Sequence, residues 1–404
     1  MFDLNVFSSI TKKIIFILFL LTILSGCSNK MEIDRINFPV ALGIDFDEKN
    51  NEIKIYAQLL STATTSTDGE QQASKTYMVL EGHGTTLLDA MADITSQGSQ
   101  NLSWKHITVV VITDKMAKHG IIDELDLLSR FQQVHLNSYL IVTKEDLKEL
   151  LESKPKIETS MAAPLAGIRL LSKQSSQIKP ITLRDFIMAY LSGGMDPVIP
   201  EVSIIKDAEE TTDKSKEKEI GLDYTKLGIC KDDKLVGFLD DDETKGAVLI
   251  YGMEDISRIT IPPSKEGKED EFTIRSIHSI PEIIPNMHKN TPSITLKLNI
   301  YYTIAQINTS TKVDTKKTDS LNKQVESYVK KNVEATFKKT QKELSSDIFG
   351  FGDKIYRKYP DYWLKHKDNW NNIFQKIDIK VQVKANLNNT GQTLNSLKYT
   401  HDKE

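Results

Sequence analysis

Cysteine and histidine are the residue types in this chain best suited to nucleophilic or metal chemistry, and both are sparse. The 404 residues contain two cysteines, Cys27 and Cys230, and eight histidines. The histidines stand at positions 83, 106, 119, 135, 278, 288, 366 and 401. No pair has the i, i+4 spacing with an intervening Glu that a helical zinc site uses. We therefore expect no bound metal, a buried apolar role for Cys230, and a hydrogen-bonded structural role for His106 at the start of a strand.

Three other motifs do not complete a catalytic or binding pattern. Gly350-Phe-Gly352 lacks the Lys-Ser/Thr of a phosphate-binding loop and follows a predicted helix instead of a strand. Asp240-Asp-Asp-Glu243 lacks the sixth-position Gly and the distal Glu of a calcium loop, so a solvated acidic turn is expected there. The chain has no Gly-x-Ser-x-Gly elbow. These absences favour a protein that is not an enzyme and that uses no cofactor.

Cys27 ends a segment that is typical of a secretory leader. Lys12 and Lys13 precede an apolar run over residues 14–23, which leads to Leu24-Ser25-Gly26-Cys27. The run is far shorter than the roughly 20 residues that span a bilayer, so residues 1–26 are expected to be a signal peptide that is removed. The Leu-Ser-Gly-Cys ending resembles the lipobox of bacterial lipoproteins, in which the Cys thiol takes a diacylglyceryl group. Two acyl chains give stable anchoring, whereas one is marginal. The alternatives are a plain signal peptide with a chance cysteine and a short uncleaved anchor.

The overall composition is ordinary for a globular chain. Hydrophobic residues make up 39% and charged residues 27%, which excludes collagen-like, fully disordered and polytopic membrane proteins. The 52 Lys and Arg against 56 Asp and Glu give a net charge of −4, so no nucleic-acid partner is expected. The length suggests two or three domains.

An N-terminal domain is expected over residues 27–205, with a mixed α/β sheet and a helical connecting region. Strands are predicted at residues 40–45, 53–59, 77–81, 106–112 and 137–142. Helices are predicted from residue 85 or 86 and over residues 120–131, 144–151, 165–171 and 182–191. The alternation favours a mixed sheet flanked by helices. Val109-Val-Val-Ile112 is continuously apolar, as expected of a central strand covered on both faces. Residues 61–75 are expected to be an exposed loop.

A charged linker over residues 206–223 is expected to lead into a C-terminal α+β domain over residues 224–391. Its strands are predicted at residues 227–230, 235–239, 247–251, 272–277, 293–304 and 377–385. A long amphipathic helix is predicted over residues 320–342, because apolar residues recur every fourth position from Leu321 to Phe337. Residues 392–404 are expected to be a flexible tail. The predicted whole is a multi-domain α+β lipoprotein with several mixed sheets flanked by helices.

Aromatic residues gather near the end of the second domain. They are Phe349, Phe351, Tyr356, Tyr359, Tyr362, Trp363, Trp370 and Phe374. Their preferred interpretation is a core beside the long helix, and the alternative is an exposed contact patch.

Several short segments occur in a fixed order along the chain. They are the lipobox with Glu32-Ile-Asp-Arg35, Leu42-Gly-Ile-Asp45, Trp104-Lys-His106 before the Val-rich strand, Gly120-Ile121 with Leu125 to Arg130, Gly194-Met-Asp-Pro-Val-Ile-Pro200, Lys234-Leu-Val-Gly-Phe-Leu239, and Asp347-Ile-Phe-Gly-Phe-Gly352 followed by Tyr356-Arg357, Pro360, Trp363 and Trp370. In this order the segments resemble the Ger(x)C family, the C-subunit lipoproteins of spore nutrient-germinant receptors. Many relatives carry Trp directly after the lipidated Cys, where this chain has Ser28.

The resemblance implies a non-enzymatic subunit with lipid on Cys27, tethered to the outer face of the spore inner membrane. It also implies two polytopic membrane subunits as partners and an elongated set of sheets flanked by helices. The leading hypothesis is thus a germinant-receptor subunit that helps to couple nutrient sensing to germination. A solute-binding lipoprotein of a transporter is the alternative, although no repeat relates residues 31–200 to 225–390. A lipid-anchored envelope hydrolase ranks third, because no nucleophile stands with a base in view.

Overall fold

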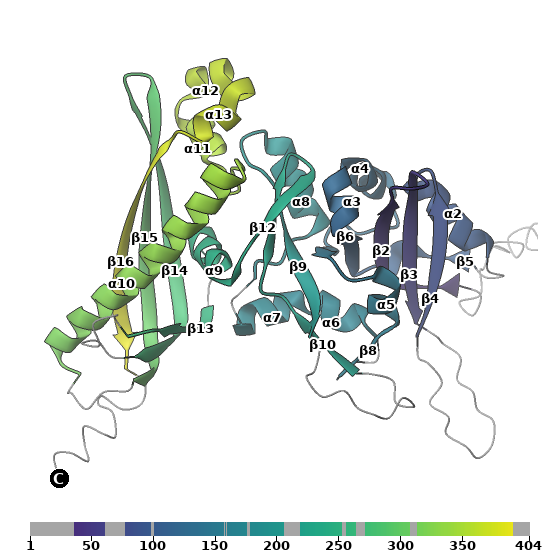
Figure 1. The fold of residues 1–404 in the computed structure, drawn as a ribbon, viewed down its shortest axis with the longest axis horizontal. Coiled ribbons are helices and arrows are strands. Elements are labelled where there is room, and N and C mark those ends of the chain that lie inside the picture. Colours follow the sequence, from purple (N-terminus) through teal and green to yellow (C-terminus); the bar gives the residue numbers. More distant parts are fainter. Residues whose placement is uncertain are drawn as a thin grey trace, which may run out of the picture.

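The computed structural model describes residues 36–60, 77–97, 101–156, 158, 160–175, 178–205, 219–252, 256–263, 271–307 and 313–390. Cys27, the predicted signal peptide, the predicted loop at 61–75, most of the predicted linker and the predicted tail lie outside these residues. The fold is α+β, as expected, with two main sheets arranged along the long axis of the molecule (Figure 1).

Ten described strands form the larger sheet, and eight of them follow one another in a single path. The order is β12 (Lys234–Leu239), β11 (Leu227–Lys231), β9 (Val198–Ile205), β7 (Tyr139–Thr143), β6 (Val109–Thr113), β2 (Pro39–Asp47), β3 (Glu52–Leu60) and β4 (Tyr77–Gly84). The remaining two strands are β10 (Glu219–Asp223), which pairs with β9, and β8 (Lys154–Pro155), which pairs with β10. Short strands β1 (Ile36–Asn37) and β5 (Asn101–Leu102) pair separately.

Strand β6 is central, because it lies parallel to β2 on one side and to β7 on the other. All five of its residues are buried. Val110 and Ile112 face one hydrophobic cluster, while Val109 and Val111 face a second one. The unbroken apolar run is therefore explained by a strand covered on both faces, as predicted.

Helices cover both faces of this sheet. The first cluster contains buried residues of α2 (Leu87–Ser96), α3 (Asp114–His119), α4 (Ile122–Arg130) and α8 (Leu183–Ser192). The second contains residues of α5 (Leu147–Glu152), α6 (Ala162–Ala166) and α7 (Ile168–Ser175). Polar side chains begin several of these helices. The hydroxyl of Thr86 accepts from Asp89 N at α2, and Thr182 forms a capping box with Asp185 at α8.

The smaller sheet has four described strands in the order β13 (Ile256–Ile261), β14 (Phe272–His288), β15 (Thr291–Ile307) and β16 (Asp378–Asn389). Alternate residues of β15, from Ile294 to Ile304, are buried, as the period-two pattern predicted. They pack beneath α10 (Thr315–Phe337), whose buried side runs from Leu321 to Phe337. The chain continues through a π-helical turn (Lys338–Glu343), α11 (Phe351–Lys358), α12 (Pro360–His366), a 3-10 turn (Lys367–Asn369) and α13 (Trp370–Phe374).

One predicted strand is a helix. Residues 247–251 lie in α9 (Asp241–Tyr251), which packs on α10. The predicted acidic turn is the start of this helix, where Asp240 Oδ1 accepts from Glu243 N at 2.8 Å and Glu243 Oε2 accepts from Asp240 N at 2.9 Å. This is a capping box. The prediction was wrong because a short apolar run has the same appearance in a strand and in a buried helix.

The large sheet extends across the predicted boundary between the domains. Residues 198–205, placed in a helical connecting region, form β9 inside the large sheet, and residues 219–223, placed in the linker, form β10. The hairpin of β11 and β12 pairs with β9, so the large sheet continues past residue 224. A sequence pattern identifies a hairpin but not its long-range partner. His106, expected on a strand, lies exposed in a 3-10 turn (Trp104–His106) with its ring edge-on to Phe38.

Candidate functional site

The structure brings together two segments that are far apart in sequence, residues 194–200 and residues 347–352. Both segments belong to the motifs that carry the family resemblance. We call their contact region the seam and define it by Gly194, Asp196, Asp347, Gly352 and Trp370. It joins the large sheet to the elements around the small sheet. The sequence predicted neither this contact nor a role for the two aspartates.

Asp347 holds the start of α11. Its Oδ1 accepts from Phe351 N at 3.0 Å, and its Oδ2 accepts from Gly352 N at 2.8 Å and from Trp370 Nε1 at 3.1 Å. The side chain is buried, with 1% of the residue exposed. Gly350, the residue directly before α11, has φ +67°, a left-handed conformation that glycine adopts without strain. A carboxylate thus supplies the acceptors that the first amides of a helix lack.

Asp196 forms the matching half of the seam. Its Oδ2 accepts from Asp347 N at 2.8 Å, while its own N–H donates to Asp347 O at 2.9 Å. Its Oδ1 accepts from Asp232 N at 3.1 Å, in the turn between β11 and β12. One side chain therefore ties together three segments of the chain.

The two carboxyl groups are electrostatically unusual, because Asp347 is buried and Asp196 is partly buried. Burial raises the pKa of Asp347 to about 7, against the opposing effect of its hydrogen bonds from Phe351 and Gly352. Burial also raises the pKa of Asp196. The negative charge of Asp196 further raises the pKa of Asp347, and that of Asp232 raises the pKa of Asp196, as expected for like charges. The protonation of Asp347 is consequently sensitive to pH near neutrality.

Backbones meet directly beside the aspartates. Asp353 N donates to Gly194 O at 3.2 Å. A Cβ atom on Gly194 would lie 2.5 Å from Asp353 N, and one on Gly352 would lie 2.8 Å from Gly194 O. Both distances are too short for real contacts, so the two glycines permit this approach.

Aromatic and aliphatic side chains surround the seam. Phe349, Phe351, Trp363, Trp370 and Phe374 are buried, and the rings of Trp363 and Trp370 meet edge to face at 5.2 Å. The core interpretation is therefore confirmed for these five residues. Of the other three rings in the predicted cluster, Tyr356 is 48% exposed, while Tyr359 and Tyr362 are partly buried.

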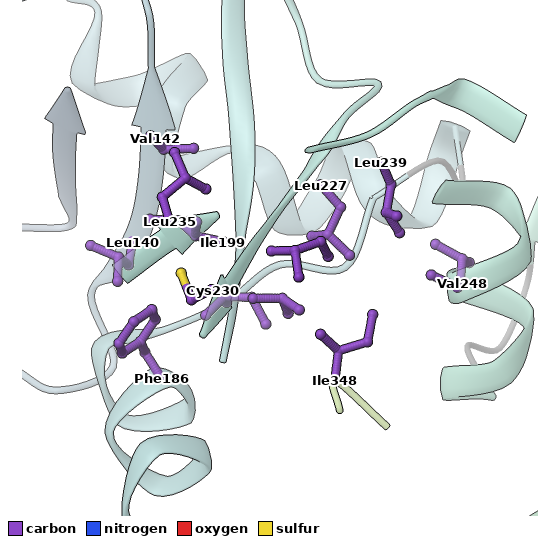
Figure 2. Packing of buried hydrophobic residues seen from close by; sticks show 14 of the residues in the cluster. Leu140, Val142, Phe186, Ile199, Leu227, Cys230, Leu235, Leu239, Val248 and Ile348 are labelled. Carbon is purple, nitrogen blue, oxygen red and sulfur yellow. The ribbon is translucent and has the colours of Figure 1, made fainter. Parts of the chain in front are cut away.

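A single hydrophobic core continues across the seam. Figure 2 shows Cys230 close to Leu140 and Leu235 of the large sheet and to Phe186 of α8, with Ile348 and Val248 on the far side of the hairpin. Cys230 is 1% exposed, and burial raises the pKa of its thiol. Its expected role as buried apolar filler agrees with this position.

Further contacts reinforce the connection. Tyr251 on α9 donates from its hydroxyl to Ile348 O at 3.1 Å, and Lys179 Nζ lies 3.7 Å from the centre of the Tyr251 ring. Burial lowers the pKa of Lys179 to about 8. The polar groups of the seam are paired with one another, which suits a rigid joint.

In the part of the chain that the structure describes, three or more His, Cys, Asp or Glu side chains nowhere gather in an arrangement that could hold a metal ion. Among these same residues, no helix combines the length and the apolar character needed to cross a membrane.

Comparisons with known proteins agree with the motifs. A family model described as "Spore germination protein N-terminal domain" matches residues 29–204, and one described as "Spore germination B3/ GerAC like, C-terminal" matches residues 225–391. The chain belongs to the Ger(x)C family of spore germination proteins, which confirms the resemblance.

Individual relatives align along nearly their whole length. Spore germination protein KC of Bacillus subtilis is 26% identical, with 96% of this chain and 98% of that protein covered. Spore germination protein B3 of the same organism is 25% identical, with 92% of this chain and 96% of that protein covered. The crystal structure of the GerBC protein is similar in fold, with a TM-score of 0.54 and 19% identity over 87% of this chain and 98% of that one.

Proposed function

We propose that this protein is the non-catalytic, lipid-anchored subunit of a spore germinant receptor. It assembles with two polytopic membrane subunits and helps to couple nutrient sensing to germination. The observation that carries the proposal is the pair of family matches, which together cover residues 29–204 and 225–391.

The seam supports a role in transmitting force or position between partners. One hydrophobic core and the paired backbone contacts of Asp196 and Asp347 connect the two sheets. A partner bound to one sheet is therefore linked mechanically to a partner bound to the other, because packed interiors transmit displacement instead of absorbing it.

Attachment is proposed through a diacylglyceryl group on Cys27, at the outer face of the spore inner membrane. The first family match begins at residue 29, two residues after this cysteine. Two acyl chains suffice for stable anchoring without a membrane-spanning helix.

The test is the Cys27→Ala variant, with Cys230→Ala as the matched control. Both remove one thiol, but Cys230 is buried in the core. We expect Cys27→Ala to move the protein from the membrane fraction to the soluble fraction and to slow nutrient-triggered germination. We expect Cys230→Ala to stay in the membrane fraction. Undiminished membrane retention of Cys27→Ala would contradict the anchor.

A further inference from the structure

The upper end of the small sheet carries a second surface, which shares only the buried Trp370 with the seam. We call it the tip and define it as residues 285–292 and 354–376. It contains the turn between β14 and β15 together with most of α11, α12 and α13 (Figure 1). Lys289 and Asn290 in the turn have φ of 45° and 63°. Paired positive φ values are typical of a tight hairpin turn that holds the strand ends in place.

Two hollows open on the tip and share Tyr362 and Asn290. The first has a volume of 410 Å³, and its charged and titratable lining residues are Lys358, Lys365, His366 and one acidic residue, Asp361. The second has a volume of 220 Å³ and is lined by Lys376. Both therefore place a cationic side chain beside an aromatic ring. Hollows of this size suit a lipid headgroup. They are too small to hold a protein helix, which is about 10–12 Å across.

The charge of the tip is opposite to that of the whole chain. The tip contains seven Lys and Arg residues and two Asp residues, whereas the complete chain has a net charge of −4. Lys358 Nζ is fixed by donating to Pro285 O at 2.8 Å, so this cation is held at the hollow. A concentrated positive surface on an acidic protein attracts a partner of negative charge.

Apolar groups stand among these charges. Leu364 is 60% exposed on α12, next in sequence to Lys365, and Tyr356 is 48% exposed on α11. The Tyr362 ring lies 4.3 Å from the His366 ring, which gives a broad amphipathic surface. Tyrosine rings prefer the boundary between lipid and water, and lysine next to an apolar residue is typical of segments that lie on a membrane.

We infer that the tip is a second membrane contact, in which the two hollows bind the phosphate headgroups of anionic lipids and Leu364 enters the interface. The inference rests on the proposed attachment through Cys27, which keeps an anionic membrane within reach. Figure 1 places the tip far from β5, whose partner β1 is the first described strand after the anchor segment. Two distant contacts fix the orientation of the molecule on the membrane, which one flexible tether does not.

The test measures vesicle binding without the anchor, so that it is independent of the proposed function. The chain from residue 27 onward, carrying Cys27→Ala, is sedimented with phosphatidylcholine vesicles that contain phosphatidylglycerol, and with phosphatidylcholine vesicles alone. We expect binding to the anionic vesicles only and its loss at high salt, because screening weakens contacts between exposed charges. Combined Lys365→Glu and Lys376→Glu should weaken the binding at least tenfold.

Matched controls separate the tip from general charge and apolarity. Lys330→Glu with Lys331→Glu makes the same charge change on the exposed side of α10. Leu170→Ser on α7 matches Leu364→Ser on α12, since the two leucines are 61% and 60% exposed. We expect the tip variants to bind more weakly and the controls to bind as the parent does.

Three outcomes would overturn the inference. They are no binding to anionic vesicles, equal losses for tip and control variants, and binding of inorganic phosphate without binding of vesicles. If purified partner subunits bound the tip while vesicles did not, the occupant would be a protein instead of lipid. Each of these results leaves the Cys27→Ala fractionation test unaffected.

Discussion

Gly194 offers the sharpest test of how the seam is built, because a single methyl group interferes there with the backbone of α11. The added Cβ of Gly194→Ala would lie 2.5 Å from Asp353 N and 2.8 Å from the carbonyl carbon of Gly352. The neighbouring Gly193 is a natural control. It has φ +68°, and a Cβ added there meets nothing within 4 Å.

The expected cost follows from these distances. Ordinary contact requires a separation of about 3.4 Å or more, so the backbones must part by roughly 1 Å, which breaks the 3.2 Å hydrogen bond from Asp353 N to Gly194 O. Overpacking costs about 1–3 kcal/mol and a lost hydrogen bond about 1 kcal/mol. Gly193→Ala incurs only the left-handed strain of about 1–2 kcal/mol. The unfolded-state effect of replacing glycine is the same for both.

Two measurements compare the variants. Urea unfolding should show that Gly194→Ala lowers the free energy of unfolding by about 1–2 kcal/mol more than Gly193→Ala does. Hydrogen exchange should become faster at the Asp353 amide in Gly194→Ala and stay unchanged in Gly193→Ala. Equal losses of stability in the two variants, or an unchanged Asp353 amide in Gly194→Ala, would refute the close backbone contact as the feature that joins the two sheets.

Three further predictions concern the core around the seam. Burial raises the pKa of Asp347 from 3.8 to about 7, so its contribution to stability is fully present below pH 3.8 and is lost as the pH rises through about 7. Urea unfolding across this range should show that Asp347→Asn removes this fall in the free energy of unfolding. Parallel curves of unfolding free energy against pH for the parent and the variant would contradict the prediction. Gly246→Ala should lower the free energy of unfolding by about 1–3 kcal/mol, since its Cβ would lie 2.6 Å from Asn332 O on α10 and press on Thr336. An unchanged free energy of unfolding in urea would mean that α9 and α10 separate freely. Trp363→Ala should lower the free energy of unfolding by about 3–5 kcal/mol, because the side chain is buried. Normal stability together with failure to co-purify partner subunits would instead indicate a contact patch.

Local patterns predicted much of the fold because their causes are local. The four apolar residues at 109–112 identified the central strand, and the four-residue recurrence from Leu321 identified α10. The strand predicted at 247–251 failed where a helix and a strand share one apolar pattern. The Asp240 and Glu243 spacing was the available signal for a helix start, since it fits a capping box.

The seam could not be predicted in the same way, because it depends on pairing between distant segments. Asp196 and Asp347 are separated by 151 residues, and neither of the short motifs in which they occur predicts a contact by itself. A buried aspartate is also unexpected from its residue type, since Asp is almost never fully buried unless paired. Its signal in the sequence is the nearby Gly350 and Gly352, which allow the chain to turn and bring two amides to one carboxylate.

The most direct test of the proposed receptor role is co-purification from spore membranes. The protein would be tagged at its C-terminus, extracted from the spore inner membrane with detergent, and recovered with its partners for mass spectrometry. The proposal predicts two polytopic germination subunits in the recovered complex. Recovery of a permease with an ATPase, or of the protein with a bound solute and no membrane subunit, would contradict it and favour a solute-binding lipoprotein.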